Sequence, residues 1–429
     1  MPPVKLFSVG AGSRGTTYAT YALEHPEHAA VVGVAEPRSF HRDRIASQHA
    51  VDADFVFEDW RDALNVPRFA DVAVITTQDK DHAEPAIELA RRGYDIILEK
   101  PIAPTEEACR RVVDEVQKAG VLLSVCHVYR YVKETVRLKE IIDSGVIGAL
   151  CNIQHFEPVG YWHQAHSFVR GNWRNEAESS FMLLSKSCHD IDWLQYIMGD
   201  HCRRVSSFGT LKHFRRENKP AGASDRCLDC SVESECPYSA PRLYLGWLRS
   251  GRKGWPVDVV APSETEEGVI DALRDGPYGR CVYECDNDVV DNQVVALEYG
   301  SGQTASFTMT AFNNVGGRKT RIFGTHGELY LNSGDREFVD GEWVVTEPVL
   351  RHFDFLTERI TYETITDHAD TALSGHHFGD YRMMERVVEA MRLRDQRLIP
   401  TGPVDTLRSH LTVFAAERSR REGRVVDVR

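Results

Sequence analysis

The stretch VKLFSVGAGSRG, residues 4–15, decides the fold of this 429-residue chain. A continuous apolar run ends in a GxGxxG turn, and a helix-forming segment follows it. Glycines at such a turn let the strand bend sharply into the helix and let backbone N–H groups approach a pyrophosphate at the helix N-terminus. The residues of this turn that we assign to cofactor binding are Gly10, Gly12, Ser13, Arg14 and Gly15.

An acidic residue downstream strengthens this interpretation, since a GxGxxG turn alone also serves simple helix packing. Glu36 lies 21 residues after Gly15, at the end of the second apolar run, where its carboxylate can accept hydrogen bonds from the adenosine ribose hydroxyls. A carboxylate there would repel the 2′-phosphate of NADP, so we expect NAD as the cofactor. Arg38, two residues later, could partly offset this preference and is included in the cofactor site.

The first third of the chain alternates apolar runs with segments of helical period. The runs are VKLFSVG, VVGVAE, DFVFED, DVAVIT, YDIILE and VLLSVC. Continuous apolar strands separated by helices indicate a parallel sheet that is covered on both faces. We therefore predict an α/β fold in which residues 1–128 form a Rossmann domain with a doubly wound parallel sheet.

The pattern changes after residue 128. The runs NQVVALEYG, QTASFTMTAF and KTRIFGTHGELYLN are typical of hairpin strands with glycine-bearing turns. We expect residues 129–429 to form a C-terminal α+β domain on an antiparallel sheet with one solvated or interface face. Residues 214–280 are its least regular part, a cysteine-bearing insertion, and residues 405–429 are expected to pack back on the Rossmann domain.

Lys100 lies in ILEKPIAPT, residues 97–105, between Glu99 and Pro101. It follows the fifth apolar run, and open α/β sheets bind their ligands at the carboxyl ends of their strands. An ammonium fixed there could hydrogen-bond a substrate hydroxyl and stabilise a developing alkoxide. Without the nucleotide motif upstream, a surface lysine paired with Glu99 would be the simpler interpretation.

Several pieces of the chain resemble the glucose–fructose oxidoreductase, inositol dehydrogenase and MocA family. They are GAGSRG, TTQDKDH, EKP, CHVYRY, SCHDIDWLQYIMG, HHFGDYRMMERVVEAM and HLTVFAAERSRREGRVVDV, and they run through nearly the whole chain. The resemblance implies a Rossmann domain followed by an α+β domain with a large open antiparallel sheet. The far face of that sheet would be an oligomer interface, so we expect a homodimer or homotetramer.

The resemblance also implies which residues lie at the nicotinamide. It gives catalytic roles to Lys100 and to His189, which we expect on a helix from about Ser179 to Met198. The family's usual aspartate, four residues before the histidine, is Ser185 here, so the usual Asp–His pair is missing. Lys186 is a further candidate cation at the catalytic site. The matching pieces add these residues to the cofactor site: Thr76, Thr77, His82, Glu99 and Lys100.

Other polar and aromatic residues suit a carbohydrate. Aromatic faces pack on the C–H faces of sugar rings, while charged groups bind hydroxyls. GHHFGD, residues 375–380, resembles the GHGGGD turn of carbohydrate-active branches of the family. The candidate substrate residues are Tyr129, Arg130, Trp162, His163, Trp173, Arg174, Ser185 and His376. Taken alone, any one of the aromatic and charged residues is better explained by core or interface packing, whereas the GHHFGD match makes His376 the stronger candidate.

Three cysteines in CLDCSVESEC have the short spacing of a metal knuckle. Cys227, Cys230 and Cys236 predict a structural zinc that would hold the insertion folded. The fourth ligand is left open among His213, Cys202, Cys281 and Cys285. The alternative is that these cysteines are free thiols packed in an irregular insertion.

Composition excludes several partners. The formal net charge of −13 argues against nucleic acids and anionic membranes, because both attract basic surfaces. No apolar run has the length of a membrane span, and the first expected strand begins at residue 4, which leaves no room for a signal peptide. We expect a cytoplasmic protein that acts on a small molecule.

Three functions are compatible with these features. The first is an NAD-dependent oxidoreductase that acts on a hydroxyl or keto group of a sugar, sugar derivative or cyclitol. The second is an NAD-dependent glycosidase that oxidises a sugar carbon transiently, eliminates the substituent and returns the hydride. The third is a non-catalytic NAD-binding sugar sensor, against which the retained Lys100 and His189 argue.

Overall fold

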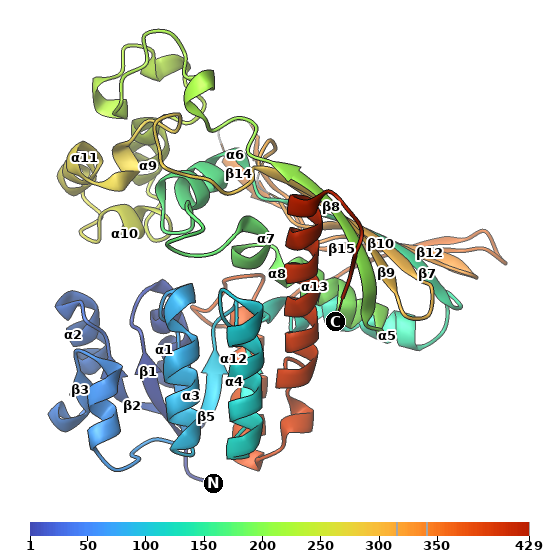
Figure 1. The fold of residues 1–429 in the computed structure, drawn as a ribbon, viewed down its shortest axis with the longest axis horizontal. Helices are drawn as coiled ribbons and strands as arrows, with labels where there is room; N and C mark the ends of the chain where they lie inside the picture. Colours follow the sequence, from blue (N-terminus) through green and yellow to red (C-terminus); the bar gives the residue numbers. More distant parts are fainter. Residues whose placement is uncertain (315, 340–341, 429) are drawn as a thin grey trace.

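The computed structural model describes residues 1–314, 316–339 and 342–428. It contains two large sheets and the helices that pack on them (Figure 1). The first sheet is parallel, in the order β3-β2-β1-β4-β5-β6, which confirms the predicted Rossmann sheet. Its strands are β1 (Val4–Val9), β2 (Ala29–Ala35), β3 (Val56–Phe57), β4 (Val72–Ile75), β5 (Asp95–Leu98) and β6 (Leu123–Val125). Every residue of β4 and β5 is buried, as strands covered on both faces require.

Helices from both ends of the chain cover this parallel sheet. One face is covered by α1 (Ser13–Glu24), α2 (Ser39–Gln48) and α12 (Gly379–Leu393). The other face is covered by α3 (Ala83–Arg91) and α4 (Glu106–Ala119). Met383, Met384 and Val387 of α12 belong to the same apolar cluster as Leu6 and Val31 of the sheet. A helix from the end of the chain thus completes the N-terminal core, which the sequence pattern did not indicate.

The second sheet has the order β16-β15-β12-β11-β7-β10-β9-β8-β17. Its strands are β7 (Leu150–Pro158), β8 (Cys202–Thr210), β9 (Asn292–Tyr299), β10 (Thr304–Thr310), β11 (Lys319–Gly324), β12 (Gly327–Asn332), β15 (Val349–Asp354), β16 (Ile360–Thr364) and β17 (Val426–Asp427). A separate hairpin pairs β13 (Arg336–Val339) with β14 (Glu342–Val345). The sheet is mixed rather than purely antiparallel, because β7 and β10 pair in parallel at its centre.

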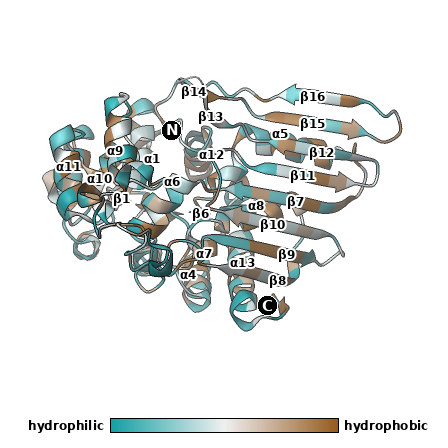
Figure 2. Ribbon diagram, turned by 90° about the horizontal axis from the view of Figure 1, so that it is seen from above, coloured by the Kyte–Doolittle hydropathy of each residue, from teal (hydrophilic) through white to brown (hydrophobic). Residues whose placement is uncertain are grey.

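The two faces of this sheet differ. The inner face packs against α5 (Lys133–Asp143), α8 (Cys188–Met198) and α13 (Pro403–Glu422) in one apolar cluster. Seen from above, the strands lie side by side with alternating apolar and polar residues (Figure 2). Phe208, Val294 and Tyr362 expose large apolar side chains on the sheet strands. An oligomer built on the far face stays a prediction.

The predicted insertion, residues 214–280, lies within the segment 211–291 that joins β8 to β9, and it is more helical than expected. It contains α9 (Ala240–Arg249), α10 (Val257–Val260) and α11 (Glu266–Asp275). Figure 1 shows these helices above α2, away from the large sheet. The remaining α-helices are α6 (Tyr161–His163) and α7 (Met182–Ser185), and η5 (Gln164–Arg170) is a π-helix. The short 3-10 helices are η1 (Ala53–Phe55), η2 (Trp60–Asn65), η3 (Asp79–Asp81), η4 (Val128–Arg130), η6 (Arg216–Asn218), η7 (Cys227–Asp229), η8 (Glu233–Glu235), η9 (Pro277–Gly279) and η10 (Gln396–Leu398).

No helix among the described residues is long and apolar enough to cross a membrane. The place of the protein in the cell stays a prediction.

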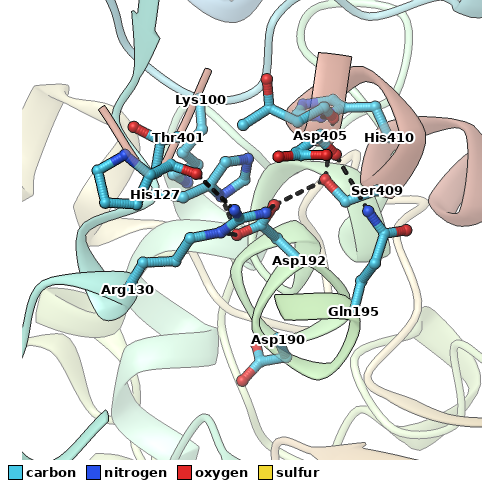
Figure 3. A network of polar contacts seen from close by, with 12 residues as sticks. Lys100, His127, Arg130, Asp190, Asp192, Gln195, Thr401, Asp405, Ser409 and His410 are labelled. Carbon is cyan, nitrogen blue, oxygen red and sulfur yellow. Dashed lines mark hydrogen bonds and ion pairs between the residues drawn. The ribbon is translucent and has the colours of Figure 1, made fainter. Parts of the chain in front are cut away.

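A buried polar network joins the two parts of the chain (Figure 3). Arg130 donates from Nε and Nη2 to the two carboxylate oxygens of Asp192, at 2.7 and 2.6 Å. Ser409 of α13 also donates to Asp192, at 2.8 Å. Burial alone would raise the pKa of Asp192, but Arg130 and then His127 hold it below its ordinary value. The pair therefore remains ionised inside the protein.

The C-terminal helix α13 also fixes the loop that follows Lys100. His410 donates from Nδ1 to the carbonyl of Thr406 at 2.7 Å, which leaves Nε2 as an acceptor. Nε2 accepts the backbone N–H of Ile102 at 3.0 Å. The residues after the EKP motif are thus held by a helix that lies more than 300 positions later.

We expect Asp192→Ala to destabilise the protein by roughly 3–5 kcal/mol, because it leaves the Arg130 guanidinium buried without its counter-charge. Urea titration followed by circular dichroism would measure this change. Asp143→Ala is the matched control, since Asp143 forms an exposed ion pair with Lys139 on α5 and its loss should change little. Equal effects of the two variants would contradict a central role for the Arg130–Asp192 pair.

Candidate active site

The GxGxxG turn has the shape that a dinucleotide requires. Gly10 has φ +94°, and a Cβ there would lie 2.8 Å from the carbonyl oxygen of Thr76. A Cβ on Gly15 would lie 2.2 Å from the carbonyl oxygen of Gly10, so α1 packs closely against β1. A Cβ on Gly12 would meet only the Arg38 side chain within 4 Å. The first and third glycines therefore serve packing, and the second leaves the space in which a pyrophosphate can approach the start of α1.

Glu36 lies at the end of β2, as predicted. It is buried, and one carboxylate oxygen accepts the Ala11 backbone N–H at 2.8 Å. Arg38 Nε donates to the other oxygen at 2.7 Å, while the Arg38 side chain stays mostly exposed. Burial alone would raise the pKa of Glu36, but the hydrogen bonds from Arg38 and Ala11 hold it below its ordinary value. Glu36 is therefore a fixed carboxylate beside the turn, paired with a largely exposed arginine.

Two residues assigned to the cofactor from sequence, Arg14 and Glu99, have partners within the protein. Arg14 donates to Glu99 at 2.7 Å and to both carboxylate oxygens of Asp380 at the start of α12. Glu99 also accepts the hydroxyl of Tyr18 at 2.7 Å. His376 Nδ1 lies 3.1 Å from Asp380. These groups form a chain of contacts from α1 through the EKP motif to α12, so their role is to hold these elements together beside the site.

The other predicted cofactor residues hold the loops that border the site. Thr76 donates to the Gly10 carbonyl at 3.0 Å, and Thr77 donates to the Asp81 carbonyl at 2.9 Å. His82 is buried and has its ring nitrogens 2.6 Å from the Pro101 carbonyl and 3.1 Å from the Thr77 carbonyl. His82 therefore ties the loop after β4 to the loop that carries Lys100. Ser13 is the first residue of α1.

Lys100 reaches across from the parallel sheet to the second domain. It lies two residues beyond the end of β5, and its Nζ donates to the carbonyl of Ser185 at 2.6 Å. The helix expected from Ser179 to Met198 is in fact two helices, α7 and α8, with Lys186 and Ser187 between them. This break frees the last carbonyl of α7 for the lysine.

Ser185 therefore contributes its backbone rather than its side chain. Its hydroxyl is buried and points to the backbone carbonyls of Phe181 and Met182, at 3.4 and 3.5 Å. The assignment of Ser185 as a side-chain substrate ligand is not supported by this geometry. Because the helix is broken, position 185 also lacks the continuous helical turn that would place it on the same face as His189.

His189 lies near the start of α8 and is 6% exposed. Its ring packs edge-on against His127 at 5.5 Å and Tyr129 at 5.3 Å, and it lies 6.0 Å from the His376 ring. Burial lowers the pKa of His189 well below its ordinary value, and the charge of Lys100 lowers it further. Within the part of the chain that the structure describes, His189 Nδ1 has no hydrogen-bond partner, and a neutral imidazole of this kind beside a lysine can accept a proton.

A second group of charges lies behind these residues and was missed from the sequence. Arg318 is buried beside the Asp190 carboxylate, 2.9 Å from the Glu157 carboxylate and 3.8 Å above the ring of Tyr129. Lys186 also pairs with Glu157, at 3.0 Å. Arg318 comes from the loop before β11, where no motif marks it, so only the three-dimensional fold brings it to His189.

The candidate substrate residues separate into two groups. Tyr129, His376 and His163 lie around the catalytic candidates. Burial lowers the pKa of His163 well below its ordinary value, and the nearby charges of Lys186, His376 and Lys100 lower it further. The others have structural partners: Arg130 pairs with Asp192, Arg174 with Asp286, and the indole N–H of Trp173 donates to Asp79 at 3.1 Å. Trp162 is buried and packs against Trp247 and Trp255 of the insertion.

The predicted zinc site is not supported. Among the described residues, the one group of at least three His, Cys, Asp or Glu side chains with ligand atoms within 4.8 Å of one another is His25, Glu27 and His28 at the end of α1. Cys227, Cys230 and Cys236 are free thiols that do not converge on a common point. Cys227 Sγ instead contacts Arg170 Nη2 at 3.5 Å. The short spacing in sequence was not sufficient, because η7 and η8 carry the cysteines in separate turns.

Models of known families match both parts of the chain. An oxidoreductase family with an NAD-binding Rossmann fold, GFO_IDH_MocA, matches residues 4–127. The C-terminal alpha/beta domain of the same oxidoreductase family matches residues 139–428. The two matches follow each other along nearly the whole chain.

Similar proteins include enzymes of sugar and cyclitol chemistry. Inositol 2-dehydrogenase of Klebsiella pneumoniae is 29% identical over 203 residues, which are 47% of this chain and 56% of that protein. 2,7-Anhydro-N-acetylneuraminate hydratase of Mediterraneibacter gnavus is 27% identical over 201 residues, or 47% of this chain and 51% of that protein. The chain thus matches about half the length of these two relatives.

A solved structure matches the full length. Levoglucosan dehydrogenase in complex with NADH and L-sorbose superposes with a TM-score of 0.70 at 18% identity, and each chain is covered completely. At this identity the likeness concerns the fold.

We expect the buried histidines to make stability depend on pH below about 6.5. Burial lowers the pKa of His127 to about 3 and that of His410 to about 4, so these rings stay neutral in the folded protein while they gain protons in the unfolded chain. Protonation then favours unfolding, and the free energy of unfolding should fall as pH decreases from 6.5 to 5, by up to about 1.4 kcal/mol per pH unit for each histidine.

Urea titrations between pH 7 and 5 would measure this slope. Both ring nitrogens of His127 lack hydrogen-bond partners among the described residues, so His127→Leu should reduce the slope without destabilising the protein at pH 7. The exposed His201 provides the control variant His201→Leu, which should keep the slope. A His127→Leu protein with the original slope would contradict this explanation.

Proposed function

Because this chain belongs to the Gfo/Idh/MocA family of NAD-binding oxidoreductases, we propose that it is an NAD-dependent enzyme that oxidises or reduces a hydroxyl-bearing carbon of a sugar, sugar derivative or cyclitol. One observation carries the proposal: Lys100 and a neutral His189 come together from two domains at the carboxyl edge of the Rossmann sheet. That edge is where dinucleotide-binding sheets hold their ligands.

The residues present fit a dinucleotide. Gly12 leaves open space at the start of α1, and Glu36 presents a fixed carboxylate at the end of β2. When bound, the dinucleotide supplies or accepts the hydride at its nicotinamide ring. Thr76, Thr77 and His82 act by holding the loops that border this space, and Arg14 and Glu99 act by joining them to α12.

Lys100 and His189 have different roles toward the substrate. In the oxidation direction, His189 accepts the carbinol proton, which a neutral imidazole can do and an imidazolium cannot. The Lys100 ammonium donates a hydrogen bond to the same oxygen and stabilises its developing negative charge. The carbonyl of Ser185 fixes the ammonium in place, so that the lysine is oriented before substrate arrives. Tyr129 packs beside the His189 ring, and His376 packs beside Tyr129.

The charges around the site favour a neutral, hydroxyl-rich substrate. Lys186 and Arg318 are offset by Glu157 and Asp190, with which they form ion pairs. Burial alone would raise the pKa of Asp190, but Arg318 and His155 hold it well below its ordinary value, so these pairs are charged and self-contained. Ion pairs of this kind offer hydrogen-bond donors and acceptors to a substrate. They carry no net charge that would attract an acidic ligand.

A relative supports a second candidate, in which the dinucleotide is restored in each cycle. The similar hydratase from Mediterraneibacter gnavus bears a name that denotes addition of water rather than net oxidation. In the corresponding reaction here, transient oxidation would acidify the neighbouring C–H, and loss of that proton would expel the substituent as its alcohol and leave an unsaturated ketone. Water would then add to the ketone's double bond, and the hydride would return to the carbonyl carbon. His189 and Lys100 would serve the oxidation step in the same way.

We expect Lys100→Met and His189→Gln to lower kcat by roughly 10²–10⁴-fold, the usual contribution of positioned acid–base groups. Lys118→Met, on the exposed face of α4, is the control and should keep full activity. The assay mixes the protein with NAD and sugars, cyclitols or aryl glycosides, and follows both NADH absorbance and product release. Full activity in either active-site variant would contradict the role assigned to the residue that was replaced.

The same assay separates the two candidate reactions. A dehydrogenase accumulates NADH in proportion to the substrate consumed. A redox-neutral enzyme releases product without net NADH and incorporates solvent deuterium at the carbon next to the oxidised one, which mass spectrometry of the product detects. We favour the dehydrogenase, because Lys100 and His189 support the hydride step and nothing in the site demands a leaving group.

We also expect NAD to bind more tightly than NADP, because Glu36 would repel the 2′-phosphate. Glu36→Gln keeps an oxygen for the Ala11 N–H and removes the charge, so it should narrow the preference by roughly tenfold, as the loss of one charge contact of about 1.4 kcal/mol predicts. Glu58→Gln, with its exposed side chain near Arg42, is the matched control. Fluorescence titration gives the dissociation constants, and comparable values for both cofactors in the unaltered protein would overturn the expected preference.

A further inference from the structure

The insertion brings an exposed tryptophan to the border of the candidate active site. The ring of Trp255 lies 5.1 Å from His163, 5.4 Å from Trp162 and 5.5 Å from His166. Trp162 is 8% exposed, whereas Trp255 is 46% exposed. Three aromatic neighbours therefore support Trp255 from behind or from the side, and a large part of the indole still faces solvent.

The support behind Trp255 is itself well packed. Trp162 meets Trp247 of α9 edge-on at 4.7 Å, and His166 stacks on Tyr278 at 4.8 Å. The Tyr244 hydroxyl lies 2.9 Å from His166 Nδ1. Trp162, Tyr244, Trp247 and Tyr278 belong to one apolar cluster, so the indole of Trp255 lies against an ordered aromatic wall. A ring that stacks on such a wall loses little freedom, because the protein side of the contact is already ordered.

His163 connects this wall to the catalytic candidates. It is the residue whose ring lies closest to Trp255 among the aromatic contacts of that indole, and its electrostatic neighbours include Lys186, His376 and Lys100. The aromatic wall therefore adjoins the charged residues of the site at His163. A substrate bound to Lys100 and His189 would extend toward Trp255 only if it carries more than the ring that reacts.

We propose that Trp255 forms a second sugar subsite, which binds a ring joined by a glycosidic bond to the ring held at Lys100 and His189. The proposal rests on the proposed function and adds the class of substrate, a glycoside with a cyclic substituent rather than a free monosaccharide or cyclitol. An exposed apolar face suits the C–H face of a pyranoside, which is neutral and flat enough to stack.

The test measures binding to the holoprotein loaded with NADH, in which oxidation cannot proceed. The probes are glucose, galactose and myo-inositol, set against cellobiose, lactose and phenyl β-glucoside, with dissociation constants from ligand-observed NMR. Trp255→Leu should weaken the two-ring probes by roughly tenfold, the effect of losing one stacked ring. Trp255→Phe should restore most of that affinity, and the one-ring probes should bind equally to all three proteins.

Four results would overturn the subsite, and the last of them would overturn the proposed function as well. A uniform loss for one-ring and two-ring probes would show that Trp255 supports the whole site rather than a second ring. A matching loss of NADH affinity in Trp255→Leu, measured by fluorescence, would assign the indole to the cofactor. If the unaltered protein binds one-ring and two-ring probes with equal affinity, and Trp255→Leu changes neither affinity, the result contradicts the subsite but not the proposed function. If it binds no probe of either kind, the proposed function falls with it.

Discussion

The hydrogen bond from the Lys100 ammonium to the carbonyl of Ser185 joins the two domains at the point where the chemistry is proposed. A lysine at the end of a Rossmann strand would otherwise extend into solvent, with many conformations open to its long side chain. The break between α7 and α8 supplies the acceptor, since the last carbonyls of a helix have no partner within it. One irregularity in a helix thus fixes the position of the main cation of the site.

Charge pairing around this contact is arranged in separate groups. Arg130 with Asp192 and Arg318 with Glu157 and Asp190 are buried pairs, whereas Arg14, which pairs with the buried Glu99 and Asp380, has a side chain that is 30% exposed. Burying such pairs is costly, and they add little to stability relative to apolar packing. Burial and the charge of Lys100 keep His189 neutral, and the pairs of Arg318 place oriented groups beside it, which suits a site that moves protons.

The parts that the sequence indicated are those in which local pattern determines structure. The GxGxxG turn, Glu36, the parallel strands and the EKP lysine all depend on neighbours within a few dozen residues. Arg318 and His410 could not be found in this way, since each acts through a partner more than a hundred positions away. The partners of Arg14, Arg130 and Trp173 could not be predicted for a related reason. A polar side chain near a motif shows that it can bind something, but only the fold shows that these three contact Glu99, Asp192 and Asp79. Their places in the cofactor and substrate sites stay predictions.

The position of α12 on the parallel sheet bears on how the chain can be made. During synthesis, β1 to β6 leave the ribosome well before residues 379–393, so the sheet face later covered by Met383, Met384 and Val387 stays uncovered until the last part of the chain appears. The central pair of the second sheet has a similar delay, because β7 must wait for β10. Contacts so distant in sequence form slowly and leave apolar surface open to other chains. The nascent protein should therefore depend on chaperones, and truncation before α12 would leave an N-terminal domain that associates rather than one that works alone.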